Sequence, residues 1–213
     1  MCEYLDNISE GLTTTQTMWL SFCDDVQIRG NIVDGAYRVV WLQYCTNVTV
    51  FGNGADNVVN EFVYVNEPDV PYQGLGYSSK IFINHNEVQN CGRAAVLIGC
   101  AADEFKVLYN YVEDATIETT GTRSAINCST GAKHGRVMHN KIRGTKHKYG
   151  IEITASCVNV QTFNNDTIGA VTKPQLNSST GGGFEGYFMH STNGNRYIVT
   201  VNDAGAPVYT AGK

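Results

Sequence analysis

Two stretches of the chain decide its fold: MWLSFCDDVQIRGN at residues 18–31 and VWLQYCTNVTVFGN at residues 40–53. They align without a gap at an offset of 22 residues, and Trp, Leu, Cys and Asn recur at matching positions. This is an internal repeat. A repeat of this length, with short alternating runs and Asn and Gly at its ends, indicates a solenoid whose coils each contain two or three short strands.

The Asn that closes each stretch recurs along the chain after further alternating runs. Its spacing widens to between 24 and 33 residues, which indicates insertions between strands. The six positions are Asn31, Asn53, Asn86, Asn110, Asn140 and Asn165. Leucine-rich repeats have a similar period, but the chain has 22 Val and 13 Ile against only 8 Leu. Because β-branched residues pack well on a pleated surface, this composition predicts an all-β protein.

Composition and charge argue against several classes of protein. The 213 residues carry a net charge of −5, so we expect no nucleic-acid partner. No apolar run approaches the roughly 18 residues of a membrane span, and the first residues lack the basic start and apolar core of a signal peptide. The seven Cys are odd in number and none forms a Cys-x-x-Cys pair, which predicts neither a disulfide framework nor a zinc site.

The recurring motif Leu/Ile-x-x-Cys-x-Asn/Asp-Val-x-Ile/Val-x-x-Asn-x-Ile/Val covers residues 18–168 and resembles the right-handed parallel β-helix, or pectate-lyase-like, family. The resemblance implies an all-β fold of about six coils, with the six Asn side chains stacked inside as a ladder. We expect the β-helix over residues 1–170, a linker over 171–183 and a small C-terminal β-strand cap or oligomerisation element over 184–213.

Five of the cysteines share a position in the repeat, 8 to 12 residues before the Asn of their coil. Because free Cys behaves as a small apolar side chain, we expect them to form a buried stack rather than a reactive thiol or metal cluster. An unoxidised stack would also indicate folding in a reducing compartment. The five are Cys23, Cys45, Cys100, Cys128 and Cys157.

Outward-facing aromatic residues form the first candidate binding surface. Alternation places Met18 and Leu20 inside and therefore Trp19 outside, and the following coils repeat this pattern. Such rows suit stacking against the apolar faces of sugars, but exposed apolar patches also mark subunit interfaces. The candidate substrate-binding aromatics are Trp19, Trp41, Phe62 and Tyr64, with Tyr72 and Tyr77 in the long insertion between residues 66 and 79.

Basic residues precede the same strand in several coils. Arg38, Arg93 and Arg123 occupy this position, and Lys146 and Lys148 lie at the equivalent place in a later coil. Stacked on one another, they would form a cationic stripe suited to the carboxylates of an acidic polysaccharide, since Arg offers bidentate geometry. The alternative interpretation is a set of solvated turns.

Cleavage of a glycan requires paired carboxyl groups or an acid opposite a base. Glu67 and Asp69 lie in the longest insertion, beside the aromatic residues, and are the first candidates for general acid and base or nucleophile. Glu118, which precedes Arg123 in an enlarged loop, and Glu152, which points outward on the aromatic strand, are the other catalytic candidates. We expect no metal ion and no cofactor.

Within the family, the sequence most resembles a bacteriophage tailspike or polysaccharide depolymerase fragment. That resemblance implies a homotrimer on the virion tail, folded in the bacterial cytoplasm, that binds and cleaves capsule or O-antigen as a hydrolase or lyase. The alternatives are a bacterial, secreted polysaccharide lyase or epimerase, and a non-catalytic β-helical stalk or adhesin. Calcium-dependent lyases use clustered Asp, and only Asp24 and Asp25 lie next to each other here.

Overall fold

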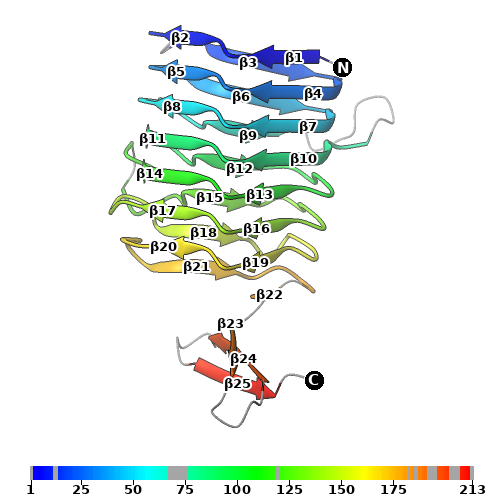
Figure 1. Cartoon of the computed structure of the whole chain (residues 1–213), viewed down its shortest axis with the longest axis vertical. Coiled ribbons are helices and arrows are strands. Elements are labelled where there is room, and N and C mark those ends of the chain that lie inside the picture. The colour runs from blue at the N-terminus through cyan, green and yellow to red at the C-terminus, as the bar shows by residue number, and fades with distance from the viewer. Residues whose placement is uncertain are drawn as a thin grey trace.

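The computed structural model describes the chain except residues 1, 12–13, 67–75, 119, 182, 185–186, 191–195, 202–206 and 212–213, and describes side chains as far as residue 181. Three parallel sheets run side by side along one axis (Figure 1). Each turn of the chain contributes one strand to each sheet in the order A, B, C, and we call such a turn a coil. No helix in the described part of the chain is long and apolar enough to cross a membrane.

Sheet A contains β1 (Cys2–Leu5), β4 (Asp24–Arg29), β7 (Thr46–Phe51), β10 (Ser79–Asn84), β13 (Lys106–Leu108), β16 (Arg136–Met138), β19 (Gln161–Phe163) and β22 (Gly183–Phe184). Sheet B contains β2 (Ile8–Glu10), β5 (Ile32–Asp34), β8 (Gly54–Asp56), β11 (Glu87–Cys91), β14 (Tyr111–Ala115), β17 (Lys141–Arg143) and β20 (Asp166–Thr167). Sheet C contains β3 (Gln16–Ser21), β6 (Arg38–Gln43), β9 (Val63–Val65), β12 (Val96–Ile98), β15 (Ile126–Cys128), β18 (Tyr149–Ile153) and β21 (Lys173–Asn177).

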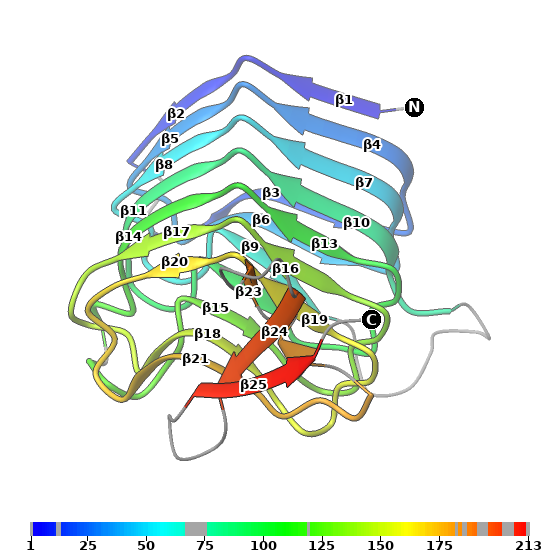
Figure 2. The same ribbon diagram turned by 60° about the horizontal axis from the view of Figure 1, so that its bottom comes forward.

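These sheets confirm the predicted parallel β-helix. Figure 2, which looks toward the C-terminal end of the stack, shows the three sheets enclosing one interior. The coils number seven rather than the six expected, because β1 and β2, which precede the first repeat, form a complete first coil with β3. Asn7 occupies the ladder position of that coil, where its side chain donates to Asn31 at 2.9 Å.

The asparagine ladder lies at the corner between sheets A and B, as predicted. All six predicted Asn residues are buried. The side-chain amide of Asn165, at the end, donates to the Val137 carbonyl, and that of each of the first five donates to the amide oxygen in the next coil, for example Asn53 to Asn86 and Asn86 to Asn110, both at 2.9 Å. The same oxygen accepts the backbone N–H of the donor residue, so each Asn side chain satisfies buried polar groups of two coils.

The five cysteines behave as the predicted apolar side chains of the interior. Cys45, Cys100, Cys128 and Cys157 are buried and Cys23 is half-buried, and all are free thiols. Burial raises the pKa of Cys45 to about 11. Since the thiolate is the reactive form, burial keeps such a thiol inert at neutral pH.

The C-terminal region departs from the expected plan. Within the expected linker, β21 pairs in parallel with β18, so that the helix continues through its seventh coil. The next strand, β22, pairs with β19 and extends sheet A once more. After it, β23 (Tyr187–His190), β24 (Arg196–Val201) and β25 (Pro207–Ala211) form a separate antiparallel sheet beyond the last coil (Figure 1).

Candidate functional site

One outward-facing position of sheet C is followed from coil to coil by the strand register. We call this set the centre column. Its seven residues, from coil 1 to coil 7, are Trp19, Trp41, Tyr64, Leu97, Asn127, Glu152 and Leu176. Neighbouring positions lie about 4.8 Å apart along the axis. The column therefore changes from aromatic to polar and acidic along one continuous line.

The aromatic part of the centre column is a stack of three rings. Trp19 and Trp41 lie with centroids 5.0 Å apart and planes inclined by 13°. Tyr64 follows at 5.8 Å from Trp41 with a tilt of 39°. Trp19 is 60% exposed, and its indole N–H donates to Gln43 at 2.9 Å, which fixes the ring. The prediction that Trp19, Trp41 and Tyr64 face outward together is confirmed.

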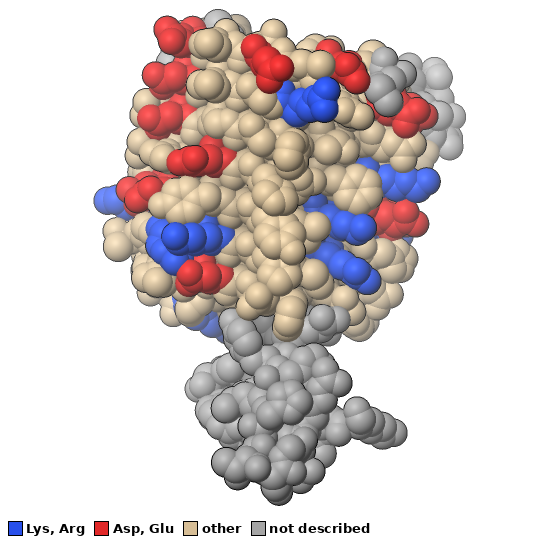
Figure 3. Space-filling model, viewed as in Figure 1, with Lys and Arg blue, Asp and Glu red and all other residues tan. Residues whose placement is uncertain are grey.

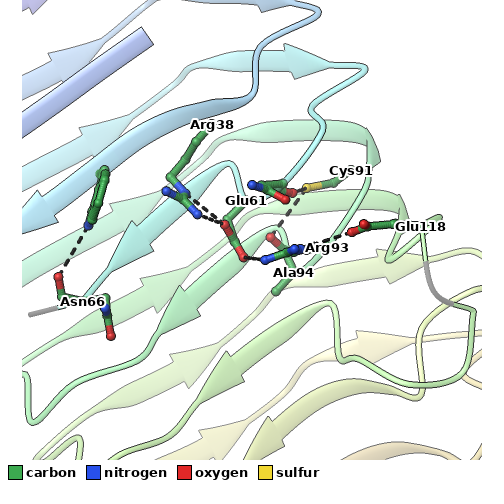
Figure 4. Close-up of polar contacts among 9 residues, drawn as sticks. Arg38, Glu61, Asn66, Cys91, Arg93, Ala94 and Glu118 are labelled. Atoms are coloured by element: carbon green, nitrogen blue, oxygen red, sulfur yellow. Dashed lines mark hydrogen bonds and ion pairs between the residues drawn. The ribbon is translucent and has the colours of Figure 1, made fainter. Parts of the chain in front are cut away.

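Beneath these rings lies a buried ion pair, although Arg38 was expected in an exposed cationic stripe. Arg38 donates from Nε and Nη2 to Glu61 Oε2 at 2.9 and 2.7 Å, and both residues are buried (Figure 4). The Arg38 guanidinium also lies 4.2 Å from the Tyr64 ring centroid and 5.1 Å from that of Trp41. Burial, followed by the charge of Glu61, raises the pKa of the Tyr64 phenol.

The predicted cationic stripe is wrong for two of its arginines, because acids neutralise them. Arg93 lies 4.0 Å from Glu61 Oε1 and donates from Nε to Glu118 Oε2 at 3.1 Å (Figure 4). The hydrogen bond to Glu118 is the main reason that the pKa of Arg93 is raised. Glu118 therefore pairs with Arg93 rather than with Arg123, which follows it in the same loop.

A pocket of about 370 Å³ opens on sheet C next to the aromatic rings. Within it, Glu152 Oε2 accepts hydrogen bonds from Ser124 Oγ at 2.7 Å and from Asn127 Nδ2 at 3.1 Å. Arg123 is exposed on the wall, and no ion pair to it is found among the described residues. The full lining is Glu61, Ala94, Leu97, Thr122, Arg123, Ser124, Asn127 and Glu152.

The pocket combines an unpaired cation, an acid held by two donors and a second acid already neutralised by arginine. An exposed guanidinium can bind a carboxylate in bidentate fashion, and a carboxyl group such as Glu152 can transfer a proton to or from a bound ligand. No group of three or more His, Cys, Asp or Glu residues able to hold a metal ion occurs in the part of the chain that the structure describes.

The remaining site predictions have mixed outcomes. Phe62 was expected to face outward but is fully buried, because two successive residues point inward where the chain turns into β9. In the same register, Val39 and Ala95 of the adjacent coils are also buried. Tyr77 is half-buried and packs against the core rather than joining the rings. Glu67, Asp69 and Tyr72 lie outside the described residues.

Leu97, Ser124 and Asn127 were not predicted from the sequence. Two spacings could have revealed part of the site, because partners in neighbouring coils are separated by about one coil of sequence. Arg38 and Glu61 are 23 residues apart, and Asn127 and Glu152 are 25 residues apart. Opposite or complementary polar residues at the repeat offset are therefore a signal for contact across coils.

Comparisons with known proteins identify solved structures with a similar fold. No protein-family model matches the chain, and no curated protein sequence does. The solved structure of PfbA, a surface adhesin of Streptococcus pneumoniae, matches with a TM-score of 0.54 at 15% identity, over 89% of this chain and 44% of that one. DFA-IIIase from Arthrobacter chlorophenolicus A6, solved in complex with GF2, matches with a TM-score of 0.53 at 11% identity, over 98% of this chain and 55% of that one. The chain thus spans about half the length of these structures, and at such identities the likeness concerns the fold.

Proposed function

We propose that the chain binds a polysaccharide along the centre column of sheet C. The observation that carries this proposal is the continuity of the stacked rings with the pocket. Exposed rings suit the apolar faces of sugars, while the Asn, Ser and carboxylate groups of the pocket suit their hydroxyls. From Trp19 to Glu152 the column crosses five coil spacings, or about 24 Å at 4.8 Å each. A surface of that length suits an extended polymer better than a single small molecule.

The charge balance of the pocket favours an acidic polysaccharide. Glu61 is neutralised by Arg38 and Arg93, so its charge is not free to repel a ligand. Arg123 remains available, and its planar guanidinium matches the geometry of a sugar carboxylate. The ligand is therefore a carboxylated glycan whose uncharged faces contact the rings and whose acid group contacts Arg123.

Cleavage of the same glycan is the second candidate function, and the position of Glu152 favours it. Ser124 and Asn127 fix one carboxylate oxygen of Glu152 inside a pocket next to a cation, an arrangement suited to proton transfer. In this proposal Glu152 exchanges a proton with the substrate while Arg123 binds the adjacent carboxylate. Glu67 and Asp69 stay candidates for a second carboxyl group. Glu118 is assigned no catalytic role, because it forms an ion pair with Arg93.

The tailspike resemblance leads to a more specific version of the proposal. In it, the chain is a region of a phage tail protein that recognises the capsule or O-antigen of its host. A bacterial polysaccharide lyase or epimerase would use the same pocket, and an adhesin would use the rings without cleavage. The presence or absence of Glu152-dependent product formation separates these alternatives.

Intrinsic fluorescence provides a direct binding assay, because both tryptophans of the chain lie in the stacked rings. We expect purified acidic capsular polysaccharides to change this fluorescence, and Trp41→Ala to weaken binding about 10-fold or more through the loss of one stacking ring. Tyr111→Ala, an outward-facing aromatic change on sheet B, is the matched control and should leave binding unchanged. Equal affinities for Trp41→Ala and the parent would contradict the proposed surface.

Product formation tests the second candidate. We expect Glu152→Gln to lower the cleavage rate about 10²-fold or more while binding persists, since the amide preserves the shape and the acceptor but removes proton transfer. Glu87→Gln on sheet B is the control. Reducing ends reveal either type of cleavage, and ultraviolet absorbance of an unsaturated product distinguishes elimination from hydrolysis. If the parent protein binds a glycan but forms no product from it, the adhesin interpretation is favoured over cleavage.

A further inference from the structure

Charge is distributed unevenly along the helix axis. Residues 2–66 contain eight Asp and Glu against two Lys and Arg, whereas residues 121–181 contain eight Lys and Arg against only Glu152 and Asp166. Figure 3 shows the result on the face formed by sheets A and B, where acids dominate the first coils and bases gather over the later ones. A molecule with opposite charge at its two ends favours an antiparallel neighbour, because a parallel neighbour would align like charges.

From its middle to its corner with sheet B, sheet A presents three columns to solvent, each with one residue per coil, and further exposed residues, among them Asp24 and Lys133, lie at the start of its strands. The middle column is Glu3, Gln27, Thr49, Phe82, Lys106, Arg136 and Gln161. The next column is Leu5, Arg29, Phe51, Asn84, Leu108, Met138 and Phe163. The corner column that follows is Asp6, Gly30, Gly52, His85, Tyr109, His139 and Asn164.

The corner column is an unusual exposed feature. His85, Tyr109 and His139 stack with centroids 5.0 and 4.8 Å apart, and all three have positive φ values near 54°. Coils 2 and 3 have Gly30 and Gly52 in the same place. Bulky residues rarely adopt this backbone conformation, and Gly adopts it freely. The corner is therefore a ridge of rings in coils 4 to 6 and an open recess at Gly52 in coil 3, whereas the carboxylate of Asp6 fills the space beside Gly30 in coil 2.

We infer that sheet A is the contact surface of an antiparallel homodimer, with a second copy of this chain as its partner. The two-fold axis lies in the interface between the two copies, parallel to the strands and over the outer face of β10. Such an axis preserves position along the strand and reverses the order of coils. Each column then faces the same column of the partner, and coil 1 faces coil 7, coil 2 faces coil 6 and coil 3 faces coil 5. This is an isologous contact, in which every pair occurs twice.

The charges agree with this register. Asp24 begins the sheet A strand of coil 2, and Lys133 holds the equivalent place in coil 6, so the two face each other across the dimer. Both side chains are exposed. In the middle column Gln27 faces Arg136, and Phe82 lies on the axis against its own copy. One like-charge contact remains, Lys80 against its copy in coil 4, beside Glu104 of the next coil.

The shape of the surface and its exposed apolar residues also agree with this dimer register. In the second column Phe51, which is 43% exposed, faces Leu108. In the corner column Tyr109, which is 50% exposed, faces Gly52, and His139 faces Gly30. A Cβ atom at Gly52 would meet nothing within 4 Å, so the recess is open to the partner's ring. Tyr109 of each copy thus enters the recess at Gly52 of the other, and His139 meets the Asp6 carboxylate beside Gly30, away from the glycan surface on sheet C.

A charge exchange tests this dimer. We expect sedimentation equilibrium of the full chain to give a dimer whose dissociation constant rises with ionic strength. Lys133→Glu replaces both symmetry-related Asp24–Lys133 pairs by pairs of acids. It should raise the dissociation constant about 10-fold or more. Asp24→Lys should do the same. The double variant Asp24→Lys with Lys133→Glu restores opposite charges and should return the constant to within about 3-fold of the parent.

Two further measurements keep the test decisive. Lys146→Glu changes the same net charge in the same coil on another face, and should leave dimerisation unchanged. Thermal melting of each variant verifies that it folds. A strict monomer at about 100 μM, a trimer, single variants that dimerise like the parent, or a double variant no better than the singles would each overturn the proposal. A trimer would instead agree with the assembly implied by the tailspike resemblance.

Discussion

The asparagine ladder and the centre column of sheet C are built in the same way and differ in content. Each takes one residue from every coil and stacks it at the coil spacing. The ladder repeats one residue type, because its amide must satisfy buried backbone groups of two coils. The centre column faces solvent and changes from Trp to Glu along the axis. Inner columns therefore carry the fold, and outer columns are free to carry the function.

The largest effect on stability should come from Glu61, which lies outside the apolar interior but is buried beneath the rings. Glu61→Gln leaves Arg38 buried without a compensating charge and should lower the free energy of unfolding by about 3–5 kcal/mol. Denaturant unfolding measures the change. Glu118→Gln is the matched control, since the half-exposed Glu118 pairs with Arg93 at the surface and should cost less than about 1 kcal/mol.

A double replacement sharpens this result. Arg38→Met together with Glu61→Leu removes both charges and should recover most of the stability lost by Glu61→Gln, because no buried charge is left alone. If the double variant is as unstable as the single one, packing around the pair matters more than its charge.

The ladder itself should show a smaller but clear effect. Asn86→Ala removes the acceptor for Asn53 and the donor to Asn110, and should destabilise the chain by about 1–3 kcal/mol. Asn84→Ala, two residues earlier and facing outward, is the control and should change stability by less than about 0.5 kcal/mol. Equal costs at the two positions would remove the distinction between inner and outer columns.

The buried His147 predicts a pH dependence. Burial lowers the pKa of His147 below its ordinary value, and Asp114 opposes the shift in part. Below a pH of about 6.5 the unfolded chain binds this proton and the folded chain does not, so stability should fall as the pH drops. The slope from one group is at most about 1.4 kcal/mol per pH unit.

The matched variant isolates this residue. Neither ring nitrogen of His147 has a hydrogen-bond partner in the described part of the chain, so His147→Leu loses no such contact. Unfolding free energies of the parent and His147→Leu between pH 5 and 8 should separate only at the acidic end. Parallel curves over the whole range would show that other groups cause the acid loss.

The smallest effect on stability should belong to the centre column. Trp19→Ala removes a ring that is 60% exposed and should change the free energy of unfolding by no more than about 0.5 kcal/mol, although glycan binding weakens. Thermal melting provides the measurement. A large loss of stability would mean that the rings support the fold as well as the ligand surface.

The difference between inner and outer columns also explains how much of the structure could be predicted from the sequence. The ladder asparagines and the outward direction of Trp19 and Trp41 were predictable, because repetition and alternation fix them. Arg38 was placed in an exposed stripe, because its position before the strand does not reveal its partner Glu61, which lies 23 residues later in the next coil. The pocket formed by Arg123 and Glu152 required the register of strands in successive coils, which variable insertions conceal.

The ladder also has a consequence for how such a chain can change in length. Within the ladder every Asn-to-Asn hydrogen bond runs in the same sense, from one coil to the following one, so all internal steps are equivalent. Deleting the 22 residues from 31 to 52 would join Gly30 to Asn53, which then receives the bonds that Asn31 received. Duplication or loss of whole coils thus preserves the ladder and changes the length of the outer surface, although this particular deletion also removes Arg38 and leaves Glu61 buried without its partner, whereas a deletion that is not a whole coil breaks the register.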